Sequence, residues 1–236
     1  MTVESGRPKI SGIASAIACG AVLVGSMARA DDPAPAQTPN WSADFVARVE
    51  ALALLETLNS DLLSNSSATL TLEHWCEVHH LASPANIKAV RVPDMDKPVS
   101  PEQRQELRVT PTEPVRYRRV RLTCGSVVLS EADNWYVPSR LTPEMNKLLD
   151  TTDTPFGKAV QALHFQRRTL SAKVLWRVLP GGWEMNAASA NAAVVPMPAN
   201  LLEHRAVLTL PDGTPFSEVV ESYTANILGF PVPRLQ

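Results

Sequence analysis

The sequence "VRYRRVRLTCGSVVLSEADNWYVP", Val115 to Pro138, decides the fold class. It consists of two runs in which β-branched and aromatic residues partly alternate with polar ones, joined at Gly125 and closed by Pro138. This pattern is typical of two short strands joined by a turn. Further strands are predicted at "IKAVRVP" (87–93), within 157–180, where the pattern mixes a helix with a strand, and in a C-terminal hairpin that turns at residues 211–213, Pro-Asp-Gly.

Helical patterns precede and interrupt these strands. Residues 42–63 carry apolar side chains at helical spacing, with Ser42 or Asp44 as the N-cap, and residues 142–150 predict a short helix. The segment "LTLEHWCEVHHL" (70–81) is compatible with a helix or a strand. The order of helix, several antiparallel strands, helix and strands predicts an α+β fold with helices laid on one sheet.

A break in the chain stands out at "TTDTPFGKAV" (151–160). Pro155 suits the first position of a new helix, and Thr154 is its predicted cap. This arrangement leaves the amides of Phe156 and Gly157 without partners at a helix N-terminus, where they could bind an anion.

The N-terminal thirty residues have the pattern of a secretory signal. Arg7 and Lys9 precede an apolar run of small residues, which ends in Ala28-Arg29-Ala30. We expect a signal peptide (1–30) cleaved after Ala30, then a Pro/Ala linker (31–40) and a single domain (41–236). The mature protein would be periplasmic or secreted, with no stable membrane span.

Two alternatives to this signal remain open. Cys19 allows a lipoprotein signal, although the residues before it form a weak lipobox. Translation from Met27 would instead leave a cytoplasmic protein.

The composition is that of an ordinary soluble globular protein, with 44% hydrophobic and 19% charged residues among 236. The formal charge is −2, and removal of the signal would leave 19 basic and 23 acidic residues. This balance gives no electrostatic footprint for nucleic acid. We expect a monomer that binds no nucleic acid.

Two cysteines, Cys76 and Cys124, remain in the mature chain. They form either a disulfide or two buried free thiols. Cys76 also lies in a cluster with His74, His79 and His80. The spacing matches no zinc module and no second Cys/His group completes a site, so a packed or solvated cluster is favoured and no metal is expected.

The strand "RYRRVR" carries four arginines. Alternation places Arg119 and Arg121 on the face of Tyr117, and Arg116 and Arg118 on the other face. Most of them are expected to be solvated. An arginine on the buried face needs an anion, and a carboxylate ligand would supply one.

Two glutamates, Glu218 and Glu221, lie in the apolar C-terminal strand "FSEVVESY". Either can face water at an edge. If one points inward, it is a candidate general acid or base with a raised pKa, or a partner for a ligand hydroxyl.

Three blocks of the sequence, taken in order, resemble the chorismate–pyruvate lyase family. They are "LLSNSSATLTLEHW" (62–75), "RRVRLTCGSVVLSEADNWYVP" (118–138) and "DTPFGKAV" (153–160). The resemblance covers most of residues 54–228 and implies a six-stranded antiparallel sheet, with helical flaps closing over a buried aromatic carboxylate.

The resemblance also implies roles for individual residues. Arg119 would grip the carboxylate, and the backbone amides of Ala68 and Phe156, the latter beside Gly157, would donate to the ligand. The essential glutamate of the last strand would be Glu221, with Glu218 as the alternative. The family's second-strand arginine falls at Asn134, which is a departure from the pattern.

The reaction implied is the cofactor-free elimination of pyruvate from chorismate, which leaves 4-hydroxybenzoate. The partner would be a small aromatic or enol-ether carboxylate. An exported protein is separated from cytoplasmic chorismate, so a non-catalytic binder of a small aromatic carboxylate on the same fold is the second hypothesis. The third is a structural periplasmic protein whose pocket has closed.

Overall fold

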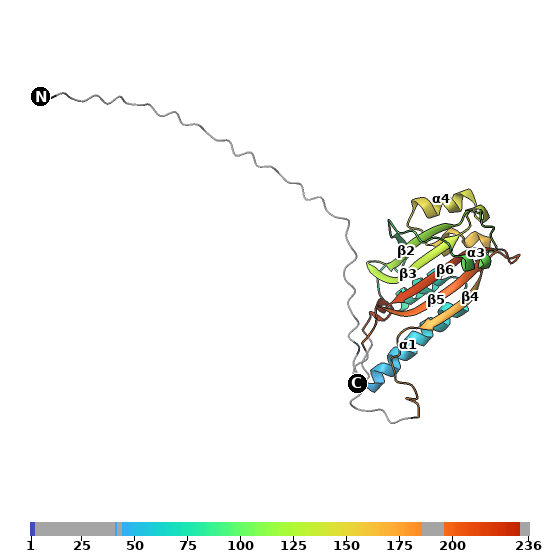
Figure 1. The fold of residues 1–236 in the computed structure, drawn as a ribbon. Helices are drawn as coiled ribbons and strands as arrows, with labels where there is room; N and C mark the ends of the chain where they lie inside the picture. Colours follow the sequence, from blue (N-terminus) through green and yellow to red (C-terminus); the bar gives the residue numbers. More distant parts are fainter. Residues whose placement is uncertain (3–40, 42–43, 186–195, 232–236) are drawn as a thin grey trace. The chain divides into compact units, whose positions relative to one another are not determined.

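The computed structural model describes residues 1–2, 41, 44–185 and 196–231. Its elements all lie in one compact unit, and six strands form a single antiparallel sheet in the order β1-β2-β3-β6-β5-β4 (Figure 1). The strands are β1 (Ile87–Arg91), β2 (Arg116–Cys124), β3 (Val127–Tyr136), β4 (Gln166–Val174), β5 (Asn200–Thr209) and β6 (Pro215–Thr224). The predicted α+β fold with a six-stranded antiparallel sheet is confirmed.

The strand pair read from Val115 to Pro138 forms β2 and β3. Gly125 makes the turn between them with φ of 56°, a left-handed conformation that favours glycine. Asp133 pairs directly with Arg119 across this ladder, and Val220 of β6 pairs with Asp133 on the other side. The C-terminal hairpin turns at residues 211–213, as predicted.

Helices α1 (Phe45–Ser64) and α4 (Pro143–Thr151) both begin with a side-chain N-cap, and the cap of α1 is one of the two residues predicted for it. Helix α1 is capped by the Asp44 side chain, which accepts a hydrogen bond from the Ala47 amide at 2.8 Å. Helix α4 is capped by Thr142. The ambiguous segment 70–81 lies mostly in helix α2 (Ala68–Val78), whose cap is Ser67.

After the break at 151–160, the new helix begins one residue later than predicted. Helix α5 (Phe156–Ala159) starts after Pro155, which is the N-cap residue rather than the first helical one. Thr154 does not cap it: no side chain caps the helix, and the Thr154 hydroxyl instead accepts a hydrogen bond from Thr152 Oγ1 at 2.8 Å.

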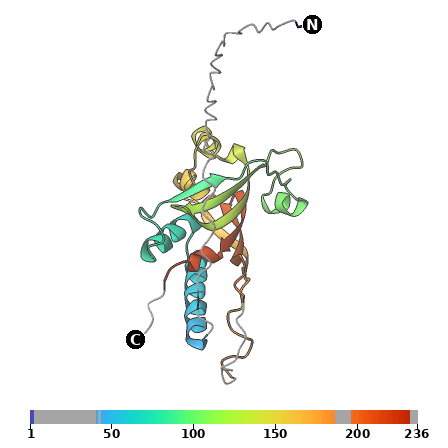
Figure 2. The same ribbon diagram turned by 90° about the vertical axis from the view of Figure 1, so that its left-hand side faces the viewer.

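One helix was not predicted. Helix α3 (Pro101–Glu106) begins with a complete capping box, in which Ser100 and Gln103 exchange hydrogen bonds between side chain and backbone. It lies on the face of the sheet opposite α2 (Figure 2). On the same face, Leu107, Trp135 and Val137 form a small buried cluster.

The other face of the sheet carries two hydrophobic clusters. The larger one packs α1 and α2 on the sheet through residues such as Leu58, Leu72 and Tyr223. The smaller one packs α4 and α5 through residues such as Leu149 and Phe216. The space between the two clusters is where the candidate site lies.

Cys76 and Cys124 form a disulfide that joins α2 to the end of β2. Both cysteines are fully buried. Of the two possibilities left open by the sequence, the structure therefore has the disulfide.

Some predicted segments cannot be compared with the structure. Residues 3–40, which contain the expected signal, Cys19, Met27 and the linker, lie outside the described residues, as do Ser42 and residues 186–195. Within the described part, no helix is both long and apolar enough to span a membrane.

Candidate functional site

A small pocket lies on the helix-covered face of the sheet, between the two hydrophobic clusters. Its floor comes from β2, β3, β4, β5 and β6, and its cover comes from the start of α2 and from α5. The walls are apolar, and they include Val120, Leu122, Val219, Leu208, Phe156 and Phe165. The void between the side chains is about 40 Å³, which has room for water but not for an aromatic ring.

Arg118 of β2 is a buried cation in this pocket. It is 4% exposed, and its Nη2 donates a hydrogen bond to the Thr154 carbonyl at 3.2 Å. Its Nε has no partner, and no acidic side chain among the described residues forms an ion pair with it. Burial lowers the pKa of Arg118 to about 10, and the positive charge of Arg91 acts in the same direction.

Arg167 of β4 lies in the same pocket but is paired. Its Nη2 contacts Glu221 Oε2 of β6 at 2.8 Å, and both side chains are less than a tenth exposed. Burial alone would lower the pKa of Arg167, but the charges and hydrogen bonds of Glu221 and Tyr223 together outweigh burial and raise it. Tyr223 donates a second hydrogen bond to the same oxygen at 3.2 Å, which leaves Glu221 Oε1 without a partner among the described residues.

Asn134 of β3 adds a neutral polar group to the pocket. Its Oδ1 accepts a hydrogen bond of 2.6 Å from the Ser217 hydroxyl. The side-chain amide hydrogens are therefore what Asn134 can offer to a ligand.

The first turn of α2 also faces the pocket through Ala68 and Thr69. Helix geometry leaves the amides of these first residues without intrahelical partners, and α2 is eleven residues long. A helix N-terminus and an unpaired arginine thus lie in one pocket, and both favour an anion.

Four of the six predicted site residues line this pocket together, namely Ala68, Phe156, Gly157 and Glu221. The other two, Arg119 and Glu218, lie on the opposite face of the sheet. The prediction that Arg119 faces the ligand is wrong in this structure, because alternation along β2 turns residue 118 inward and residue 119 outward.

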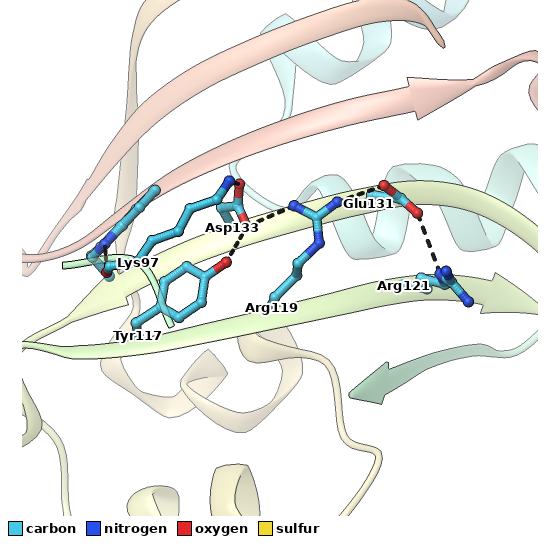
Figure 3. A network of polar contacts seen from close by, with 7 residues as sticks. Lys97, Tyr117, Arg119, Arg121, Glu131 and Asp133 are labelled. Carbon is cyan, nitrogen blue, oxygen red and sulfur yellow. Dashed lines mark hydrogen bonds and ion pairs between the residues drawn. The ribbon is translucent and has the colours of Figure 1, made fainter. Parts of the chain in front are cut away.

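The outward position of Arg119 is fixed by ion pairs, as Figure 3 shows. Its guanidinium contacts Glu131 at 2.7 Å and Asp133 at 2.9 Å. Asp133 also accepts hydrogen bonds from Tyr117 and Lys97. Burial alone would raise the pKa of Asp133, but these three donors outweigh burial and lower it.

Glu218 is fully buried under α3 rather than in the pocket. Its Oε1 accepts hydrogen bonds from Arg205 Nε at 2.9 Å and from Gln103 Nε2 at 3.2 Å. Since Arg205 also pairs with Glu102, Glu218 connects α3 to the outer face of the sheet. Glu218 and Glu221 are three positions apart along β6, an odd offset, so the two glutamates cannot share a face.

Sequence reasoning did not assign a ligand contact to Arg118 or to Arg167. Strand alternation had grouped Arg118 with the residues opposite Tyr117, which was the signal for its inward position. Arg167 lies in a segment predicted only as a mixture of helix and strand, so its face could not be assigned.

The histidine cluster near Cys76 does not form a candidate metal site. Cys76 is used by the disulfide. His79 stacks between the rings of Trp75 and Phe230. In the described ranges, no group of three His, Cys, Asp or Glu side chains has the geometry to hold a metal ion.

No family model matches the chain. The uncharacterized protein y4mC of Sinorhizobium fredii (strain NBRC 101917 / NGR234) is 57% identical over 199 residues, which cover 83% of this chain and 84% of that protein. The chain belongs to the y4mC family.

Solved structures with a similar fold include proteins described as possible or putative transcriptional regulators. PhnF from Mycobacterium smegmatis has a TM-score of 0.44 at 14% identity, covering 74% of this chain and 71% of its own. YydK from Bacillus subtilis, a possible transcriptional regulator, has a TM-score of 0.38 at 18% identity, covering 63% of each chain. The ligand-binding domain of a putative GntR-family regulator from Bordetella bronchiseptica has a TM-score of 0.36 at 14% identity, covering 60% of this chain and 87% of that one. Likenesses at this level carry no statement about the function of the y4mC family.

Proposed function

We propose that the pocket binds a small aromatic carboxylate. The observation that supports this most strongly is Arg118, a buried guanidinium without a carboxylate partner among the described residues. A buried unpaired charge is costly, and a bidentate carboxylate removes that cost. The start of α2 adds amide donors for the same anion.

The rest of the pocket suits a ring. Apolar side chains, among them Phe156 and Phe165, surround the space next to Arg118. Glu221 offers a hydrogen-bond acceptor and Arg167 a donor in the same pocket. A ring hydroxyl can use both, because it donates one hydrogen bond and accepts another. We infer that α5 moves outward when a ring binds, because the present void is about 40 Å³ and a benzene-sized cavity needs about 150 Å³.

Isothermal titration calorimetry with benzoate and 4-hydroxybenzoate tests this proposal. Arg118→Met should weaken binding at least about tenfold, since a hydrogen-bonded charge is worth about 1.5–3 kcal/mol. Arg119→Met is the matched control and should leave the affinity unchanged. Benzamide, which has the same shape without the charge, should not bind detectably.

Two outcomes would contradict the proposal. Equal benzoate affinity in wild type and Arg118→Met would show that the arginine does not hold the carboxylate. No binding of either acid would favour the structural protein with a closed pocket.

A second candidate function is the elimination of pyruvate from chorismate, and the free Oε1 of Glu221 favours it. In this reaction the ring loses its C4 hydrogen as a proton and the C3–O ether bond breaks. The ether electron pair leaves with enolpyruvate, which takes up a proton to become pyruvate, and the ring becomes 4-hydroxybenzoate. Arg118 would hold the ring carboxylate, and Glu221 would accept the proton or bind the ring hydroxyl.

The charge of the pocket ranks this second candidate below simple binding. Arg118, Arg167 and Glu221 together give a formal charge of +1, which one carboxylate neutralises, whereas chorismate carries two. Incubation with chorismate would decide the matter. Equal amounts of 4-hydroxybenzoate and pyruvate, lost in Glu221→Gln, would establish the lyase, and absence of both products would exclude it.

We also propose that the protein is exported and works in an oxidising compartment. The disulfide between Cys76 and Cys124 supports this, because disulfides persist mainly outside the cytosol. Fusion of residues 1–40 to a reporter that is active only after export is the test. A reporter that stays inactive would contradict it. A monomeric state and the absence of nucleic-acid binding stay predictions.

A further inference from the structure

A second cavity lies against the outer side of the pocket. It has a volume of about 330 Å³, much larger than the pocket itself. The two cavities share four lining residues, Ser66, Ser67, Gly157 and Phe165. They are therefore neighbouring compartments separated by these side chains, and we refer to the larger one as the outer cavity.

Gly157 lies at the narrow point between the two compartments. A Cβ at this position would be 3.2 Å from Ser67 Oγ and 3.5 Å from Thr69 Oγ1, with Phe165 Cζ at 4.0 Å. The backbone of Gly157 is not in the left-handed region, so its conformation does not require glycine. What the position requires is space between α5 and the start of α2.

The outer cavity is lined mainly by polar side chains that can form hydrogen bonds. They are the hydroxyls of Ser66 and Ser67, the Gln161 amide and the His164 ring, beside the apolar Leu70. Lys158 also lines it, but its ammonium group is bound by Glu73 at 2.7 Å and Asn86 at 3.2 Å. The charge of Lys158 is thus already neutralised, so this compartment suits polar uncharged groups better than a second anion.

We propose that the natural ligand is longer than a benzoate and occupies both compartments. Its aromatic carboxylate would bind Arg118 in the pocket, and an uncharged, hydroxyl-bearing substituent would pass Gly157 into the outer cavity. The ligand class is an aromatic carboxylate that carries a polar ether or ester extension. This inference rests on the proposed function for its carboxylate end and adds the extension.

The test compares benzoate with its 3- and 4-(2-hydroxyethoxy) derivatives by isothermal titration calorimetry. We expect one of the two derivatives to bind about tenfold more tightly than benzoate, the gain that one or two added hydrogen bonds give. Both isomers are used because substituents at C3 and C4 leave the ring in different directions, and only one of these directions should lead to the passage at Gly157.

Leu70→Trp fills the outer cavity without changing a residue that lines the pocket. Leu70 is 45% exposed, so the larger ring should be tolerated, and Leu63→Trp on α1 is a control at the same exposure. Leu70→Trp should remove the gain of the extended ligand and leave benzoate affinity unchanged, whereas Leu63→Trp should change neither. Gly157→Ala should reduce the same gain by narrowing the passage.

The outcomes separate the extension from the proposed function. Benzoate binding without a gain for either derivative, or a gain that survives Leu70→Trp, would overturn the extended ligand alone. No binding of benzoate or of either derivative would contradict the carboxylate-binding function itself.

Discussion

Arg118 and Arg119 are consecutive residues of β2, and their side chains lie on opposite faces of the sheet. Arg118 is buried without a carboxylate partner among the described residues, whereas Arg119 is held by both Glu131 and Asp133. One strand therefore carries an uncompensated cation inside and a compensated cation outside. The same substitution should have opposite consequences for stability at the two positions.

Arg118→Met should stabilise the ligand-free protein. It removes a buried guanidinium that forms no ion pair with the described residues and replaces it by an apolar side chain of similar length, and relief of a buried group without its partner is worth about 1–3 kcal/mol. The lost hydrogen bond to the Thr154 carbonyl offsets part of this gain. Urea unfolding at pH 7 without ligand measures the difference.

Arg119→Met is the control and should destabilise the protein by about 1 kcal/mol, because it leaves two partly buried carboxylates with fewer donors. An Arg118→Met protein that is less stable than the wild type would contradict the prediction for Arg118.

The inward orientation of Arg118 could be predicted from strand alternation, but not from the resemblance to the lyase family. Alternation alone grouped Arg118 opposite Tyr117, and the structure has that arrangement. The resemblance to the lyase family instead rested on the spacing Arg-x-x-x-x-Cys, which ends at Cys124 and therefore selects Arg119. Because residues 119 and 124 are an odd number apart, an undisturbed strand points them to opposite faces. The rule of alternation was the better guide, since it follows from backbone geometry.

Other parts of the site could not be read from the sequence. The pairing of β6 with β3 brings Glu221 and Asn134 into one pocket, and such long-range pairing has no local signal. Arg167 precedes a register shift between Thr169 and Ser171, so alternation along β4 does not fix its face. Helix α3 did have a local signal, the capping box from Ser100 to Gln103, which was missed.

Glu221→Gln should destabilise the protein by about 3–5 kcal/mol, because it leaves the buried Arg167 without its counterion. The double variant Glu221→Gln/Arg167→Met should recover a large part of this loss. Urea unfolding of the wild type, both single variants and the double variant gives the coupling energy directly. A coupling near zero would mean that the pair in the pocket contributes nothing to the folded state.

Loss of the disulfide should destabilise the protein by about 4 kcal/mol in the chain-entropy model, given the separation of 48 residues between Cys76 and Cys124. Unfolding with and without reductant measures this loss. The Cys76→Ala/Cys124→Ala variant should be as unstable as the reduced protein and insensitive to reductant. Equal stability of oxidised and reduced wild type would show that α2 does not depend on the bond.

Stability should fall in acid through Asp133. The hydrogen bonds from Lys97, Tyr117 and Arg119 outweigh burial and hold its pKa below the ordinary value of 3.8. The folded state therefore binds its proton more weakly than the unfolded state, and the contribution is complete above pH 3.8 and lost as the pH falls towards the folded pKa. Asp133→Asn should be less stable at pH 7 and should lack this acid-dependent loss.

The same network should produce a second loss of stability in alkali. Burial, followed by the hydrogen bond to Asp133, raises the pKa of Tyr117 from 10.0 to about 12. The unfolded chain releases this proton at lower pH than the folded protein does, so stability is complete below pH 10 and declines as the pH rises towards 12. Urea unfolding between pH 8 and 12 should show this decline in wild type and not in Tyr117→Phe. A decline of the same size in both proteins would assign it to other groups and remove Tyr117 from the network that Asp133 organises.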